Sequence, residues 1–216
     1  MTAITDYASL KTAVLDEAQR VGQAPFIALL PRFVQAAEQM IAYGFGNLDP
    51  VRIQDMETDA DVTFTDGAGS VPSDYLEQVG LDWDSDLNIV PDYVTNDDFN
   101  RLRNRTASTY PSLYTVKGGS ILLSPAASGT GKLRYYAKYA ALSGDSDTNW
   151  LLANAPLVYF HAVCHFAFKR LRNDEKAAEH ANDYAGAVSG IVRANERART
   201  AGRRLRPFIK PARIRC

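Results

Sequence analysis

The chain has 216 residues, of which 46% are hydrophobic, and a formal net charge of -1 at pH 7. This length suffices for one sizeable hydrophobic core, which predicts a single domain. No segment reaches the roughly 20 consecutive apolar residues of a membrane span, and residues 1–10 lack the basic start and apolar stretch of a signal peptide. Cys164 and Cys216 make no disulfide framework, so we expect a protein of a reducing compartment without membrane contact.

Two helices are predicted at the start of the chain, over residues 6–21 and 25–43. Thr5 or Asp6 can cap the first helix, whose apolar residues recur at helical spacing through Val21, and Gly22 ends it. Pro31 lies inside the second pattern and cannot donate a backbone hydrogen bond. The second helix therefore either kinks at Pro31 or begins afresh with Pro31 in its first turn.

In residues 51–142 the apolar residues recur with the two-residue period of strands. Branched and aromatic residues recur in short segments separated by turn formers, which predicts an antiparallel sheet of five or six strands. Lys117-Gly118-Gly119 predicts a tight hairpin turn, and residues 128–131 predict a looser one. Thr95 is expected to cap a short helix that continues through Asn104. The segments expected as strands are 51–56, 62–65, 75–83, 113–116, 120–123 and 132–139.

Two longer helices are predicted over residues 155–171 and 174–200. Asn154 and Pro156 suit the start of the first, and its apolar residues are so dense that most of its circumference must be buried. Asn173 suits the cap of the second. We expect an αα-hairpin that packs on the N-terminal helix pair, and a hairpin this apolar suggests further burial against neighbouring subunits. The predicted fold is α+β, a helical bundle with a β-rich antiparallel insertion over residues 51–142, all in one domain over residues 1–202.

Residues 203–216 predict an extended basic arm. The segment has two prolines, no helical period and no partner within itself for its apolar residues. Apolar anchors among arginines favour docking on a neighbouring protein, whereas the arginines alone would also suit nucleic acid. The candidate docking residues are Arg203, Arg204, Leu205, Arg206, Pro207, Phe208, Ile209, Lys210, Pro211, Arg213, Ile214 and Arg215.

The charges are segregated along the chain. Residues 49–98 hold fourteen acidic residues and one basic residue, whereas residues 193–216 hold nine basic residues and one acidic residue. Such segregation says more about partners than about fold. The candidate acidic face consists of Asp55, Asp59, Asp61, Asp66, Asp82, Asp84 and Asp86.

No motif in the chain specifies catalysis. The glycines before Lys132 do not complete a phosphate-binding loop, and the aspartates lack the spacing of a calcium loop. His161 and His165 share a helix face, and a structural zinc site formed with His180 is one interpretation. Packing in a core or an interface is the favoured role because the neighbouring residues are apolar. We therefore expect no enzyme, no cofactor and no metal.

Five segments, in their order along the chain, resemble the head-to-tail adaptor proteins of tailed bacteriophages, especially those of short-tailed phages. No segment alone is a functional signature, and the likeness runs from Ile4 to Ala198. The segments are residues 31–38 (PRFVQAAE), 71–77 (VPSDYLE), 114–121 (YTVKGGSI), 133–143 (LRYYAKYAALS) and 149–156 (NWLLANAP).

The resemblance implies a structural protein of the virion neck, assembled in the host cytoplasm. It further implies a dodecameric ring under the portal protein, a central channel for the genomic DNA, and a C-terminal arm that reaches into the portal. A tail tube, nozzle or tail fibre protein would bind below, and the acidic face would line or border the channel. A DNA-binding protein that uses the basic C-terminal region is the alternative from a different class.

Overall fold

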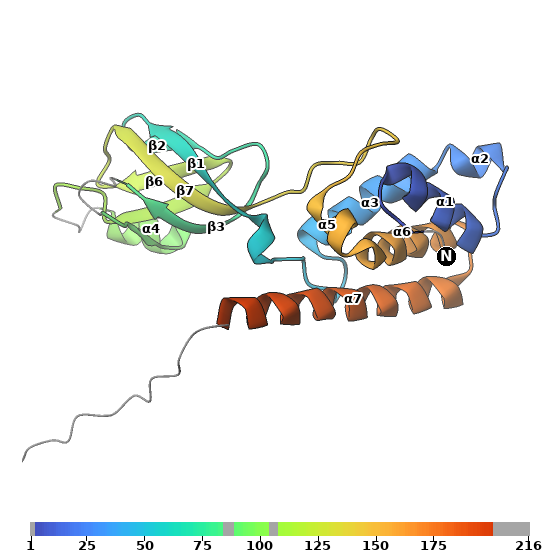
Figure 1. Ribbon diagram of the computed structural model, residues 1–216. Coiled ribbons are helices and arrows are strands. Elements are labelled where there is room, and N and C mark those ends of the chain that lie inside the picture. Colours follow the sequence, from blue (N-terminus) through green and yellow to red (C-terminus); the bar gives the residue numbers. More distant parts are fainter. Residues whose placement is uncertain (1–2, 84–88, 104–107, 201–216) are drawn as a thin grey trace, which may run out of the picture.

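The computed structural model describes residues 3–83, 89–103 and 108–200 (Figure 1). Most helices gather at one end of the molecule and the strands at the other, where the short helix α4 (Asn96–Leu102) also lies. The long final helix runs beneath the helical end toward the strands. The fold is α+β, as predicted. Among the described residues, no helix is both long enough and apolar enough to span a membrane.

The N-terminal helices follow the apolar pattern, but the first ends earlier than predicted, whereas the second pattern ends at Tyr43 as predicted. Helix α1 ends at Glu17 instead of residue 21, because Gln19 adopts a left-handed φ of 53°, and Val21 is 68% exposed. The second pattern divides into two helices, the latter with Pro31 in its first turn, which confirms one of the two predicted outcomes. The helices are α1 (Tyr7–Glu17), α2 (Ala24–Ile27) and α3 (Leu30–Tyr43).

The C-terminal hairpin agrees with the prediction, except for a short helix before it. The Asn173 side chain accepts a hydrogen bond from the Lys176 N–H, and so caps the last helix. Asn154 does not cap α6 (Pro156–Arg170), whose N-cap is Ala155, because Asn154 is the last residue of the short helix that Asn149 caps. The helices are α5 (Trp150–Asn154), α6 (Pro156–Arg170) and α7 (Asp174–Thr200).

Helix α6 is the centre of the helical core. It contacts α1, α3, α5 and α7, so the hairpin packs on the N-terminal helices as expected. Most of its apolar residues are buried within this one chain, although Leu157 remains 50% exposed. The density of apolar residues in α6 therefore reflects an internal core and is no argument for contact between subunits.

The β-rich region consists of two sheets that share a second core. One sheet has the order β1-β7-β3 and the other β2-β6-β5-β4. Their buried side chains, among them Phe64, Trp83, Tyr114 and Leu133, form a cluster separate from the helical core. The elements are η1 (Gln54–Met56), β1 (Glu57–Phe64), β2 (Ala68–Ser70), β3 (Tyr75–Asp82), β4 (Asp92–Tyr93), α4 (Asn96–Leu102), β5 (Leu113–Lys117), β6 (Ser120–Ser124) and β7 (Gly129–Ala137).

Several predictions about the strands were wrong in detail. The described residues form seven strands, of which β2 and β4 were missed, and β4 pairs with β5 in parallel rather than antiparallel. Residues 51–56 form an extended segment and η1, and residues 129–131 begin β7 instead of forming a turn. The tight turn at Gly118 and Gly119 is confirmed, since both have positive φ and join paired strands, a conformation that glycine adopts freely. Thr95 caps α4, and Asn104 lies outside the described residues.

The end of α7 ties the helical part to the strands. The Asn195 side chain accepts a 2.9 Å hydrogen bond from the Gln54 N–H, and Arg199 pairs with Glu57 at the start of β1. Arg199 also donates to the Tyr136 hydroxyl at the end of β7, at 3.3 Å. The last helical turns, from which the C-terminal arm continues, are thus fixed to the junction between the two cores.

Candidate interaction surfaces and a histidine cluster

Three of the candidate acidic residues lie on one exposed face of the sheet β1-β7-β3. Asp59 and Asp61 alternate with more buried residues along β1, and Asp82 ends β3. In the sheet register, Asp59 is opposite Arg134 of β7, and both Asp61 and Asp82 are opposite Lys132. Residues opposite one another across strands point to the same face. The two bases therefore stand between two acids of β1 and one acid of β3.

Arg134 partly neutralises this face. Its guanidinium lies 3.5 Å from Asp59 Oδ1 and 3.5 Å from Asp82 Oδ2. The side chains of Arg134, Asp59 and Asp82 are all about half exposed. Ion pairs at such exposed positions are weak and are screened by salt. The face is thus mixed in charge rather than uniformly acidic.

The remaining candidate acids lie elsewhere. Asp55 is exposed in η1, at the junction with the helical part. Asp66 sits in the turn after β1 with a φ of 49°, and its N–H donates to Ser128 Oγ at 3.0 Å. Asp84 and Asp86 lie outside the described residues. That the acidic residues border a DNA channel stays a prediction.

The basic end of the chain is described only as far as Thr200. Arg193, Arg197 and Arg199 are exposed on the last two turns of α7. All twelve candidate docking residues, from Arg203 to Arg215, lie outside the described residues. Their role as a docking arm stays a prediction.

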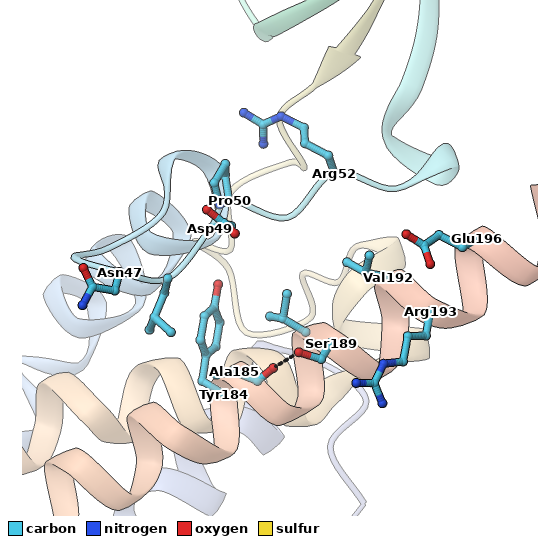
Figure 2. Close-up of a pocket in the computed structure, with 12 residues that line it drawn as sticks. Asn47, Asp49, Pro50, Arg52, Tyr184, Ala185, Ser189, Val192, Arg193 and Glu196 are labelled. Atoms are coloured by element: carbon cyan, nitrogen blue, oxygen red, sulfur yellow. Dashed lines mark hydrogen bonds between the residues drawn. The ribbon is translucent and has the colours of Figure 1, made fainter.

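A groove that the sequence did not indicate runs along α7 (Figure 2). The segment after α3, with Asp49 and Pro50, forms one wall, and Tyr184 and Val192 of α7 form the other. The Tyr184 hydroxyl is buried and has no hydrogen-bond partner among the described residues, and burial raises its pKa. Because the walls come from segments far apart in sequence, no local pattern could have predicted the groove.

Arg52 closes the strand side of this groove. Its Nη1 donates to the Ala42 and Val51 carbonyl oxygens at 3.0 and 2.8 Å, and its Nε donates to Glu77 Oε2 at 3.1 Å. One guanidinium therefore joins the end of α3, the chain that leaves it, and β3. Because these three hydrogen bonds fix the Arg52 side chain, the fold itself determines the shape of this end of the groove.

Two of the three histidines meet between α6 and α7. Nδ1 of His161 lies 3.1 Å from Nδ1 of His180 and 3.7 Å from Oδ2 of Asp183. Together the three residues offer donor atoms that all lie within 4.8 Å of one another. Two imidazoles and a carboxylate are ligands that transition metals accept.

His165 does not join this cluster. Its Nδ1 lies 2.8 Å from the Ala177 carbonyl oxygen, and its ring is buried. The interpretation with all three histidines as ligands was therefore wrong, and Asp183 was missed. The spacing of His180 and Asp183 along one helix face could have revealed the latter. His161 and His180 also lie at comparable distances from the hairpin turn, and such residues face each other in an antiparallel pair.

The surroundings favour neutral imidazoles in the cluster. Burial lowers the pKa of His161, and the nearby carboxylates of Asp183 and Glu17 oppose this effect. Burial and the adjacent His161 ring lower the pKa of His180 in the same way. A neutral imidazole has the free nitrogen lone pair that a metal requires.

Comparison with known proteins identifies the family. No curated protein matches the chain. A family model described as SU10 adaptor protein matches residues 5–207, which is nearly the whole sequence. The chain therefore belongs to the SU10 adaptor protein family, a family of structural phage head-tail adaptors.

Proposed function

We propose that the chain forms a closed ring, a dodecamer, between the portal protein and the tail in the virion neck. The ring surrounds a channel for the genomic DNA and has no enzymatic activity. Residues 203–216 hold it to the portal, and the β-rich region faces a tail tube, nozzle or tail fibre protein. The match to the adaptor family over residues 5–207 is the observation that carries this proposal.

The placement of α7 supports the role of the arm. The chain continues into the arm from a helix whose end is tied to the junction between the two cores by Asn195 and Arg199. A docking segment that starts from a fixed point loses less entropy on binding than one that starts from a free tail. Apolar residues between basic ones suit a partner with pockets and an acidic rim.

The alternative function is DNA binding by the same region. Exposed Arg193, Arg197 and Arg199 precede the basic arm, so arginines continue from the helix into the tail. Arginine clusters bind phosphates by releasing counterions, and such binding weakens steeply with salt. This function needs the charges of the arm but not its apolar residues.

Two full-length variants separate these functions. The first replaces Leu205, Phe208, Ile209 and Ile214 by Ser and keeps every basic residue. The second replaces the arginines of residues 203–215 by Gln and keeps the apolar residues. Binding to purified portal protein and to duplex DNA is measured over a range of salt concentrations.

Docking predicts that the serine variant loses portal binding by at least about tenfold, because buried apolar anchors carry most of the energy of such contacts. DNA binding predicts that the same variant keeps its salt-dependent affinity for DNA and that the glutamine variant loses it. A serine variant that joins virions normally would overturn the proposed role of the arm.

A further inference from the structure

We propose that His161, His180 and Asp183 form a binding site for a divalent transition metal, with Zn²⁺ as the preferred ion. His161 belongs to α6, and the other two ligands belong to α7. A bound ion would therefore link the two helices of the hairpin. This inference stands independently of the proposed place of the protein in the virion.

The distances between donor atoms suit tetrahedral zinc. Zinc lies about 2.0–2.1 Å from imidazole nitrogens and carboxylate oxygens, so tetrahedral ligand atoms are about 3.3 Å apart. The two Nδ1 atoms are 3.1 Å apart, and His161 Nδ1 and Asp183 Oδ2 are 3.7 Å apart. All three donors lie within 4.8 Å of one another, so side-chain rotation has to bring the widest pair closer by up to about 1.5 Å to reach tetrahedral spacing.

The His180 ring is held in the orientation that the site requires. It stacks on Phe168 with 5.2 Å between ring centroids and 10° between ring planes. Its second nitrogen, Nε2, lies 3.9 Å from Glu17 Oε1 of α1. A carboxylate behind a metal-bound histidine favours the tautomer that leaves the other nitrogen free for the metal. The 3.9 Å separation exceeds a hydrogen bond, and Lys176 Nζ lies 3.7 Å from the same oxygen. Glu17 would therefore act as a positioning residue once its carboxylate approaches Nε2 in the metal-bound state.

The exposure of the three ligands leaves a path for the ion. The His180 side chain is 8% exposed and the His161 side chain 16%, whereas the Asp183 side chain is 52% exposed. The ion would enter beside Asp183, and water would complete its coordination there. Two nitrogen ligands disfavour Mg²⁺ and Ca²⁺, which prefer oxygen donors throughout.

A direct hydrogen bond between the two histidines is the competing interpretation. One Nδ1–H would donate to the other Nδ1 across the 3.1 Å gap, which requires opposite tautomers in the two rings. This arrangement holds the hairpin together without an ion. The two interpretations differ in whether added zinc binds here.

The test uses full-length protein that has been freed of metal by a chelator. Titration calorimetry with ZnCl₂ should show about one zinc bound per chain. The midpoint of thermal unfolding should rise by about 5 °C or more when zinc is in 100-fold excess over its dissociation constant. Co²⁺-loaded protein should lack a thiolate charge-transfer band, which distinguishes this site from binding at Cys216.

Conservative variants locate the site. Asp183→Asn and His161→Gln should each weaken zinc binding by at least about tenfold, and Glu17→Gln should weaken it by about tenfold through the orientation of His180. Glu179→Gln is the matched control, since it removes an exposed carboxylate next to His180 from the same helix. It should keep the affinity of the unaltered chain.

The unfolding midpoints in chelator show whether a variant has simply lost stability. Asp183→Asn should unfold at the same temperature as the unaltered chain without zinc and should lose the rise with zinc. The proposal would be overturned if the unaltered chain bound no zinc, or if the Asp183→Asn and His161→Gln variants bound zinc as tightly as the unaltered chain does.

Discussion

Glu38 holds a carboxylate in a half-buried position on α3. Its Oε1 accepts a 2.8 Å hydrogen bond from the Leu142 N–H, in the chain segment between β7 and α5. Burial raises its pKa above the ordinary value of 4.5, and the bond from Leu142 opposes the rise only in part. The folded protein therefore binds a proton at Glu38 more tightly than the unfolded chain does.

The Glu38→Gln variant tests this effect through its dependence on pH. A raised pKa contributes stability that is fully present below pH 4.5 and is lost as the pH rises through the folded pKa. The unaltered chain should lose stability as the pH rises from 4.5 toward 7, whereas Gln does not titrate. The free energy of unfolding of Glu38→Gln, relative to that of the unaltered chain, should therefore increase over this pH range. Urea denaturation at a series of pH values measures the difference.

Glu38→Ala is the control for the hydrogen bond itself. This substitution leaves the Leu142 N–H without the Glu38 acceptor, so Glu38→Ala should be less stable than Glu38→Gln by about 1 kcal/mol at any pH. A difference between Glu38→Gln and the unaltered chain that stays constant with pH would show that the carboxyl group titrates normally in the folded state.

Asn149 organises the start of the C-terminal helical elements. Its Oδ1 accepts the Leu152 N–H at 3.0 Å and so caps α5. Its Nδ2 donates to the Ala140 carbonyl oxygen at 2.9 Å and to the Tyr159 hydroxyl oxygen at 2.8 Å. One amide thus joins α5, the preceding loop and the buried face of α6.

Substitution of Asn149 by Ala should lower the free energy of unfolding by about 2 kcal/mol, because a helix cap and two further hydrogen bonds are lost. Asn149→Asp keeps the cap acceptor but loses both donors, so its loss should be comparable or larger. Tyr159→Phe removes a single acceptor, and a loss of about 1 kcal/mol is expected. Guanidinium denaturation gives the three values, and a harmless Asn149→Ala variant would contradict this role.

The helices could be predicted from the sequence because their signals are local. Pro31 and Pro156 each lie in the first turn of a helix, and Asn173 caps α7 as predicted. The strand signal was less reliable. Val51 and Ile53 are buried against the helical core in an extended segment that is not part of either described sheet. Their alternation with exposed residues therefore resembled the apolar pattern of a strand.

The missed features all depend on which segments meet in space. β2 and β4 are too short to show a period, and the groove beside α7 has walls from distant segments. The alternation in β1 predicted an exposed acidic face, but it could not show that Lys132 and Arg134 of β7 lie between the acids. Register between strands is set by pairing, which a single sequence does not display.

At the scale of the whole molecule, apolar packing and polar contacts both join the two hydrophobic cores. Leu76 of β3 and Tyr136 of β7 pack against the helical core. One polar connection is Arg52, which holds the end of α3 and Glu77 of β3. Another is the end of α7, through Asn195 and Arg199. In the proposed ring, these contacts would fix the position of one core against the other.

Replacing Asn195 or Arg199 by Ala should loosen the last two turns of α7 without unfolding either core. Hydrogen exchange of the amides in residues 193–200 should become faster by roughly fivefold for each variant, which corresponds to about 1 kcal/mol. Arg197→Ala is the matched control, because Arg197 is exposed on the same turns and makes no ion pair with any residue that the structure describes. Equal exchange in all three variants would mean that α7 is held by its apolar contacts alone, and the arm would then start from a flexible hinge rather than a fixed point.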